Sequence, residues 1–302
     1  MQGFTSKVIK SIPIYCNYHL LNNLHHFKAI KSEFNHNLTK GPGIVVIKNL
    51  INYDTIKSTN QEIYKIIDNQ KDPLNDHFSN NQRIWNFYEK FCKSNTDLFI
   101  SYFKNPILDL ISSSYLGPKY EITNQINIVK PESKAQIFHR DYHLGLMDEK
   151  MLEEYPFNIH ISSPNLTLQG LVAHSDINPI NGSTKFIPFS QLRKYGFKMI
   201  KKERVLEICE KNYIQLELNI GDGVFFNPAV FHAAGDNNDS NDRIANLFQI
   251  NSAFSKPMEL VDNKLIKNLV TDRLNFNNLS YNETSTINNI IFNKYEYPKI
   301  LD

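Results

Sequence analysis

The chain has 302 residues, with 33 basic and 31 acidic side chains and a formal net charge of +2. A net charge this small creates no long-range field, so we expect neither nucleic acid nor a membrane surface as a partner. Hydrophobic residues make up 41% of the chain, which is enough for a sizeable core. The aromatic share of 12% argues against long disordered segments.

The three cysteines, Cys16, Cys92 and Cys209, are far apart and odd in number. Their spacing predicts neither a disulfide framework nor a CxxC metal pair. Free thiols suit a reducing compartment, and no apolar run is long enough for a signal peptide or a bilayer span. We therefore expect a cytoplasmic protein.

The N-terminal part, to about residue 118, is predicted to be mainly helical. Leucines are spaced as in a helix around residues 20–24, and a turn at 41–43 precedes a short buried strand at 44–47. An amphipathic helix is predicted for 54–67 and a polar loop for 69–81. Residues 96–115 favour a helix interrupted at Pro106, with Asn105 capping the second part and Gly117 ending it.

From residue 120 onward, the spacing of hydrophobic residues changes to the spacing typical of strands. Strands are predicted at 121–129, 166–173, 213–218, 224–226 and 244–250, with turns at 181–182 and 221–223 between them. Helices followed by a run of strands favour an α+β fold with a sandwich or barrel-like core. We expect one domain over residues 1–302, with the β core at about 120–255 and a helix-and-loop segment at 256–302.

One His-x-Asp pair stands out in this strand-rich part. Because side chains alternate along a strand, His139 and Asp141 project from the same face and can reach one divalent ion. His232, just after the strand at 224–226, can supply a third ligand. Two histidines and one carboxylate form the facial triad of non-haem Fe(II) oxygenases, which leaves positions open for oxygen and a co-substrate. Each residue also has a structural interpretation, with Asp141 orienting His139 and His232 a hydrogen-bonded core residue.

Arg243 follows His232 by 11 residues and begins the strand at 244–250. A hairpin through the loop at 235–242 would bring its guanidinium back beside the metal. This planar, permanently charged group suits the distal carboxylate of a bound dicarboxylate. The alternative is a surface salt bridge with Asp239 or Asp242.

Four ordered segments over about residues 41–255 give the chain a family resemblance. They are Gly43–Ile47, Leu116–Pro118 with Asn127–Pro131 and Gln136–His143, Asn181–Pro188, and Gly221–Phe226 with His232–Asn237 and Arg243. This set resembles the phytanoyl-CoA dioxygenase family of iron- and 2-oxoglutarate-dependent oxygenases. The resemblance implies a double-stranded β-helix (a cupin-like jelly roll) flanked by helices.

The resemblance also implies chemistry. Fe(II) would be held by His139, Asp141 and His232, with Arg243 anchoring 2-oxoglutarate and Gln136 and Asn127 as further, weaker candidates for its site. O2 would be the second co-substrate, and an unactivated C–H bond of a small-molecule metabolite would be hydroxylated, desaturated or cyclised with release of succinate and CO2. Because related halogenases lack the carboxylate ligand, its presence here favours these outcomes over halogenation.

The sequence departs from the family pattern where many members carry a hydroxyl residue two positions after the distal histidine. Ala234 stands there, so another group must support the arginine. Residues 188–191 lack a family Pro-Gly-Ser-His ending, and we assign them an architectural role.

Two other functions remain open. A non-catalytic metabolite-binding protein on the same fold would not need a complete ligand set, and a zinc hydrolase would leave Arg243 without a role. The substrate is not readable from the sequence, because loops at 142–165 and 190–212 would shape the pocket. His143 and His174 are expected at the pocket mouth or on the surface, and Trp85 over the site or in the core. The basic residues between 198 and 204 are expected on a solvated face.

Overall fold

The computed structural model describes residues 3–69, 75–76, 79–141, 149–274 and 278–292. Its strands are β1 (Lys7–Ile9), β2 (Ile12–Cys16), β3 (Ile44–Lys48), β4 (Asn75–Asp76), β5 (Ser79–Ile84), β6 (Glu121–Val129), β7 (Thr167–Ala173), β8 (Lys185–Ile187), β9 (Ile214–Gln215), β10 (Gly223–Phe226), β11 (Phe231–Ala233) and β12 (Arg243–Asn251). Its α-helices are α1 (Asn17–Asn22), α2 (Phe27–Thr39), α3 (Tyr53–Asn69), α4 (Phe87–Ser94), α5 (Thr96–Phe103), α6 (Pro106–Leu116), α7 (Glu149–Glu153), α8 (Phe157–Ser162), α9 (Gly196–Met199), α10 (Glu203–Asn212), α11 (Asn263–Arg273) and α12 (Tyr281–Ile287).

Two sheets form the core. The large sheet has the order β1-β2-β3-β10-β7-β12-β6-β5-β4 and is antiparallel except for the pair β2 and β3. The small antiparallel sheet has the order β11-β8-β9. Residues 136–139 add a further short segment beside β11, through a backbone bridge between His139 and His232. This arrangement confirms the α+β fold with a jelly-roll core.

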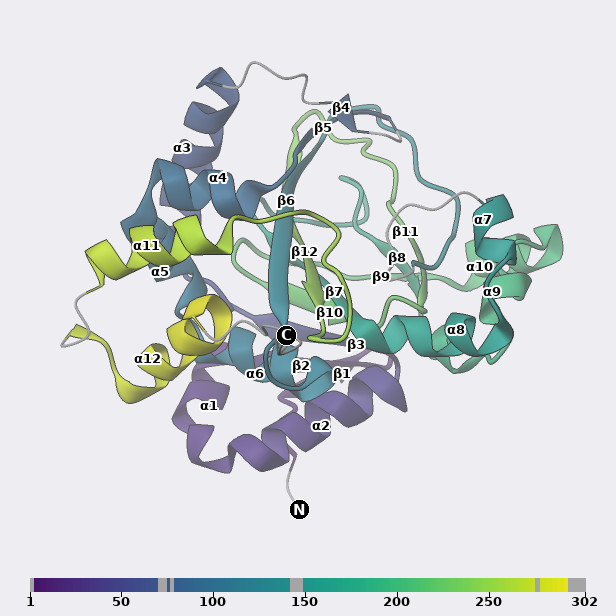
Figure 1. Ribbon diagram of the computed structural model, residues 1–302. Helices are drawn as coiled ribbons and strands as arrows, with labels where there is room; N and C mark the ends of the chain where they lie inside the picture. Colours follow the sequence, from purple (N-terminus) through teal and green to yellow (C-terminus); the bar gives the residue numbers. More distant parts are fainter. Residues whose placement is uncertain (1–2, 70–74, 77–78, 142–148, 275–277, 293–302) are drawn as a thin grey trace, which may run out of the picture.

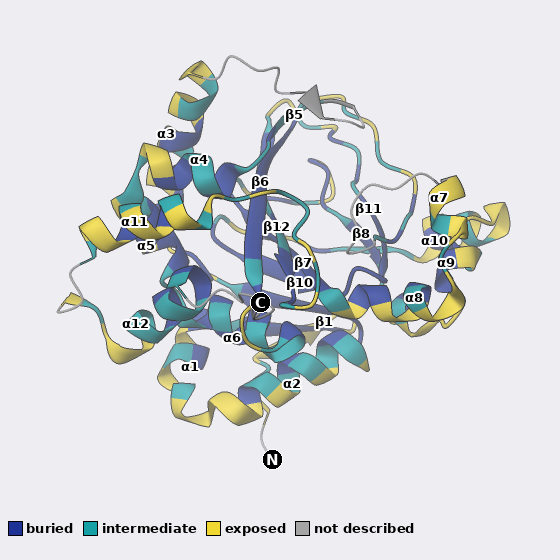
Figure 2. Ribbon diagram, in the orientation of Figure 1, coloured by how far each residue is buried: buried dark blue, intermediate teal, exposed yellow. Residues whose placement is uncertain are grey.

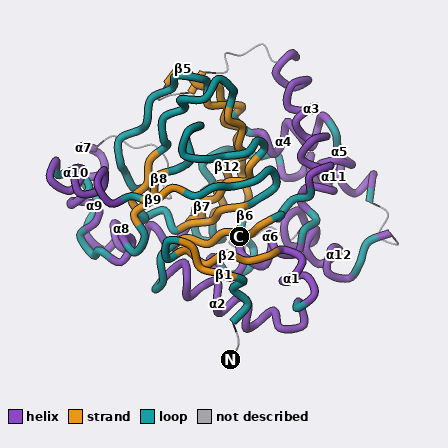
Figure 3. The backbone as a smooth tube through the Cα atoms, turned by 180° about the vertical axis from the view of Figure 1, so that it is seen from behind, coloured by secondary structure: helices purple, strands orange, loops and turns teal. Residues whose placement is uncertain are grey.

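Helices from the N- and C-terminal parts of the chain cover one face of the large sheet, as Figures 1 and 3 show from opposite sides. Helices α3, α4, α5 and α11 lie together there, whereas the small sheet lies across the opposite face with α7–α10 outside it. Side chains of the central strands alternate between the two faces of the large sheet, and both faces are covered. In β12, Phe248 packs against the helices and Ala245 packs between the two sheets. Figure 2 accordingly shows β6 and β7 buried and much of α10 exposed.

Several predicted elements are confirmed. Strands β3, β6, β7, β10 and β12 match their predicted ranges closely, as does helix α3. The break between α5 and α6 also falls where predicted, because the Asn105 side chain accepts a hydrogen bond from the Ile107 amide and Pro106 occupies the first turn. Gly117 ends α6 with φ of 77°, a conformation that favours glycine.

Other predictions were wrong in position or type. The N-terminal part is not only helical, since β1–β5 all join the large sheet, and β4 and β5 fall largely within the predicted loop at 69–81. The strand predicted at 213–218 is reduced to Ile214–Gln215 with an isolated bridge at Leu218. The predicted loops at 142–165 and 190–212 include helices α8, α9 and α10, while residues 142–148 and His143 lie outside the described residues.

A polar network is buried between the helices and the large sheet. His174, only 1% exposed, lies with Nε2 3.0 Å from the Tyr102 hydroxyl and Nδ1 2.6 Å from the Asn60 side-chain oxygen. Asn246 donates to the same hydroxyl. The expectation that His174 lies at the pocket mouth or on the surface is therefore wrong. Burial lowers the pKa of His174 to about 3, so the imidazole stays neutral in the folded protein.

This network makes stability sensitive to acid. Because the folded-state pKa of His174 lies below the ordinary value near 6.5, the unfolded chain takes up a proton first as pH falls. His174 should therefore cost up to about 1.4 kcal/mol of unfolding free energy per pH unit below pH 6.5. We expect His174→Gln to be less stable at pH 7 but to show a shallower decline between pH 6 and 4. Urea denaturation over this range measures both slopes, and parallel curves would contradict the assignment.

Candidate metal centre

Two neighbouring backbone segments bring the three predicted ligands together. The His139 amide donates to the His232 carbonyl at 3.0 Å, and the His232 amide donates back to His139 at 2.9 Å. This pairing places the two imidazole rings 4.5 Å apart between centroids. The Asp141 amide donates to the Pro228 carbonyl at 2.9 Å, which holds the carboxylate over the same point.

The ligand atoms converge. One nitrogen from each histidine and one oxygen of Asp141 all lie within 4.8 Å of one another. His139 Nε2 is 3.8 Å from Asp141 Oδ1, and His232 Nε2 is 3.5 Å from Asp141 Oδ2. At 3.8 Å Asp141 does not hydrogen-bond His139, so the interpretation of Asp141 as an orienting partner for His139 is not supported.

Both histidines use their other ring nitrogen for the backbone. His139 Nδ1 is 2.9 Å from the Ile137 carbonyl, and His232 Nδ1 is 2.8 Å from the Val230 carbonyl. A carbonyl only accepts, so each Nδ1 carries the proton and each Nε2 presents a lone pair to the centre. Backbone partners of this kind typically orient histidines that bind metals.

The electrostatics favour the ligand-competent protonation states. Burial, followed by the neighbouring His232, lowers the pKa of His139 and so favours the neutral imidazole. Burial alone would raise the pKa of Asp141, but the contacts with His232, His139 and Gln169 together lower it well below its usual range. Two imidazole lone pairs and a carboxylate then face one another, and such a set of acceptors is suited to hold a cation. Two imidazole nitrogens and one carboxylate oxygen are ligand types that suit Fe(II).

Arg243 begins β12 on the face between the sheets and is 3% exposed. Its Nη1 donates to the Gly182 carbonyl at 3.1 Å, and its Nη2 donates to Asn127 Oδ1 at 2.7 Å. Its Nε has no hydrogen-bond partner. Burial, with a smaller effect of Arg83, lowers its pKa to about 10, so it remains charged at neutral pH.

No carboxylate of the described residues forms a salt bridge with this buried guanidinium. Asp242 pairs instead with Lys130, with Nζ 2.7 Å from Oδ2, and Asp239 bonds to its neighbours Ser240 and Asn241. The alternative of a surface salt bridge to Arg243 is therefore wrong. A buried cation with only neutral partners is costly, which is the condition expected of a binding site for an anion.

The two weaker candidates occupy different places. Asn127 lies beside the predicted anchor and orients the Arg243 guanidinium, which is the support that Ala234 cannot give. The side-chain oxygen of Gln136 accepts a hydrogen bond from the Ala234 backbone amide at 3.1 Å, and the Gln136 backbone amide donates to the Ala234 carbonyl at 3.0 Å. Gln136 thereby fixes the segment that carries His139 alongside β11.

Sequence reasoning missed two residues, one in contact with Asp141 and one close to Arg243. Gln169 of β7 donates from Nε2 to Asp141 Oδ2 at 2.5 Å. Arg83 of β5 is the Cα partner of Asn127, donates to Gln125 Oε1 at 3.0 Å and stacks 5.0 Å from the Trp85 ring centroid. A glutamine within the apolar run of β7 was the available signal, whereas nothing in the sequence placed Arg83 near Arg243.

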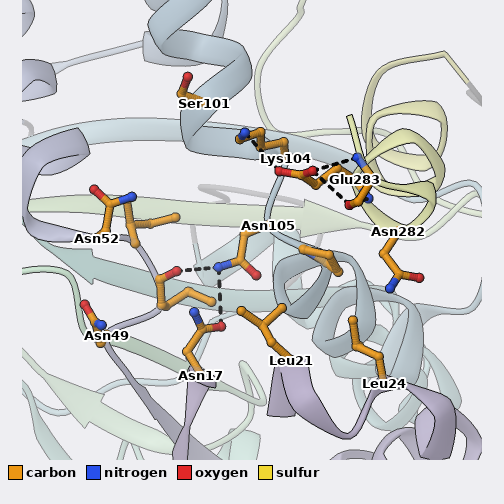
Figure 4. Close-up of a pocket in the computed structure, with 14 residues that line it drawn as sticks. Asn17, Leu21, Leu24, Asn49, Asn52, Ser101, Lys104, Asn105, Asn282 and Glu283 are labelled. Carbon is orange, nitrogen blue, oxygen red and sulfur yellow. Dashed lines mark hydrogen bonds and ion pairs between the residues drawn. The ribbon is translucent and has the colours of Figure 1, made fainter. Parts of the chain in front are cut away.

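The basic residues Lys198, Lys201, Lys202 and Arg204 are all exposed, as predicted. A surface groove of about 420 Å³ lies elsewhere, between α1, the end of α5 and α12 (Figure 4). Three of its polar side chains have structural roles, since Lys104 pairs with Glu283 at 2.9 Å and Asn105 caps α6. None of the predicted ligands lines it.

A jelly roll that brings two histidines and a carboxylate to one point has the architecture of non-haem iron oxygenases. The family model described as phytanoyl-CoA dioxygenase (PhyH) matches residues 40–245, which is more than half of the chain. The chain belongs to this family and is an iron- and 2-oxoglutarate-dependent dioxygenase. No curated protein sequence matches it.

Solved structures share the fold at low sequence identity. The carbocyclase SnoK from nogalamycin biosynthesis is 16% identical with a TM-score of 0.57, covering 81% of this chain and 91% of its own. The epimerase SnoN from the same biosynthesis is 12% identical with a TM-score of 0.55, covering 78% and 88%. HygX from Streptomyces hygroscopicus, solved with nickel and 2-oxoglutarate, is 15% identical with a TM-score of 0.53, covering 77% and 90%.

Among the described residues, no helix is long and apolar enough to cross a membrane.

Proposed function

We propose that His139, Asp141 and His232 hold one Fe(II) and that Arg243 anchors the distal carboxylate of 2-oxoglutarate. The proposal rests on one observation: a cluster of acceptor atoms and a buried cation, each of which can bind a group of opposite charge. Three converging acceptor atoms can hold a cation between them. The buried guanidinium of Arg243 has only neutral hydrogen-bond partners, which favours binding of an anion. Fe(II) with 2-oxoglutarate would supply both groups at once.

Bound together, Fe(II) and 2-oxoglutarate would supply the chemistry by which O2 oxidises a C–H bond, with succinate and CO2 as co-products. The residues of the chain position these reactants. The backbone carbonyls at Ile137 and Val230 would direct both Nε2 lone pairs toward the metal, and Asn127 sets the plane of the Arg243 guanidinium. A guanidinium fixed in this way would bind the dicarboxylate in one orientation.

The substrate of this chain is proposed only as a class: a small-molecule metabolite that is hydroxylated, desaturated or cyclised. Asp141 occupies the position that halogenases leave open, which favours these outcomes over halogenation. The named structural neighbours include an epimerase and a carbocyclase, so the fold does not decide among outcomes. We further propose a single catalytic domain over residues 1–302, a cytoplasmic location, and no nucleic acid or membrane partner.

The direct test is spectroscopic. The anaerobic protein is expected to bind one Fe(II), and addition of 2-oxoglutarate should then produce a visible metal-to-ligand charge-transfer band. Tight zinc binding without such a band for iron would favour a zinc hydrolase. A protein that bound both groups but never consumed 2-oxoglutarate with any member of a metabolite library would favour the non-catalytic alternative.

A further inference from the structure

Gln169 lies on the opposite sheet from the metal ligands. It belongs to β7, a central strand of the large sheet, with Phe226 of β10 and Gln249 of β12 as its Cα partners on either side. The residue is 6% exposed and points between the sheets, since its neighbours Leu168 and Gly170 are on the helix-facing side. From this rigid position it reaches Asp141, 28 residues away in sequence.

The orientation of its amide follows from the partner. A carboxylate only accepts, so the group 2.5 Å from Asp141 Oδ2 must be the Gln169 Nε2 donor. The other amide atom, Oε1, is buried without a hydrogen-bond partner. The contact with Asp141 is therefore the polar interaction that fixes this side chain. A buried glutamine with a half-satisfied amide is costly for a core position, which argues against a purely structural role.

The contact makes the two oxygens of Asp141 unequal. Oδ2 accepts a hydrogen bond from Gln169 and lies 3.5 Å from His232 Nε2, whereas Oδ1 lies 3.8 Å from His139 Nε2 and accepts no hydrogen bond from Gln169. A carboxylate with one oxygen engaged presents the other to a metal as a single ligand atom. If both oxygens bound, one of the three positions left by a facial triad would be lost.

We propose that Gln169 is a positioning residue that keeps Asp141 a one-oxygen ligand and so preserves an open coordination position for O2. This inference rests on the proposed function of the metal centre. Partners of metal ligands typically affect metal affinity or activity by about ten- to a hundred-fold, and we expect an effect of that size here.

The test compares Gln169→Leu, which removes the donor at similar size, with Gln249→Leu as a matched control. Gln249 is the Cα partner of Gln169 and has no side-chain hydrogen bond to Asp141. We expect Gln169→Leu to weaken Fe(II) binding about ten-fold or more and to shift the 2-oxoglutarate charge-transfer band. Nitric oxide, which needs an open position, should bind the iron and 2-oxoglutarate complex of this variant more weakly. The control should match the wild type in all three measurements.

The outcomes separate this inference from the proposed function. If the wild type forms no iron and 2-oxoglutarate complex, the proposed function itself fails. If the wild type forms it and folded Gln169→Leu shows the same iron affinity, band and nitric oxide binding, only the role of Gln169 is overturned. An equal change in Gln249→Leu would also overturn it, because the effect would then come from packing. Gln169→Glu, which keeps size but places a carboxyl oxygen against Asp141, should lose at least as much as Gln169→Leu at neutral pH.

Discussion

Replacement of His139 or His232 by alanine is expected to abolish iron-dependent formation of succinate. Each variant removes one of three donors whose atoms lie within 4.8 Å of one another. The remaining imidazole and carboxylate would hold Fe(II) too weakly to keep it in place under assay conditions. Iron titration followed by a 2-oxoglutarate turnover assay measures both losses.

The two variants differ in their expected cost to the fold. His232 is 7% exposed and its ring packs 4.9 Å from that of Phe226, so its truncation leaves a small cavity. His139 has a more open side chain, and its alanine variant should melt close to the wild type. The exposed His19 in α1 provides a control for loss of any imidazole. A folded His139→Ala protein with retained turnover would remove that residue from the metal site.

Two of the three candidate ligands, His139 and Asp141, were predictable from the sequence because their signal is local. His139 and Asp141 are two positions apart, which places both side chains on one face of an extended segment whatever the surrounding fold. Arg243 needed one further step, since a loop and a following strand return the chain toward His232. The sandwich or barrel-like β core followed from the order of apolar strands such as β6 and β12, which are long enough to show their period, whereas the jelly roll was implied by the family resemblance.

The residues and strands that were not predicted depend on contacts that only the tertiary structure creates. Gln169 and Asp141 lie on different sheets, so no spacing rule connects them. Strands β8, β9 and β11 have two or three residues each, too few for any alternation to appear. The polar sequence of β5 resembles a loop and becomes a strand only because β6 offers it a paired edge. His174 looked like a surface histidine because its partners Tyr102 and Asn60 come from helices far away in sequence.

Replacement of Arg243 by methionine is expected to weaken 2-oxoglutarate binding by roughly a hundred- to a few-thousand-fold, without loss of iron. Leaving a partly buried carboxylate without its partner costs about 3–5 kcal/mol, and that free energy converts to such a factor. Arg243→Lys should lose less, because one charge remains while the two-pronged geometry does not. The measurement is a titration of 2-oxoglutarate into anaerobic iron-loaded protein, followed by the charge-transfer band.

The free protein gives a second and independent signature of the same role. Without 2-oxoglutarate, Arg243 is a buried cation whose partners, Gly182 and Asn127, are neutral, so Arg243→Met should not lower and can raise the melting temperature. Added 2-oxoglutarate should stabilise the wild type and leave this variant unchanged. Lys130→Met and Lys185→Met are the matched controls, because each removes a cation that already has a carboxylate partner, at 2.7 and 3.1 Å. If Arg243→Met kept its affinity for 2-oxoglutarate and one of the lysine variants lost it, that lysine would be the anchor. The buried guanidinium of Arg243 would then have only a structural role.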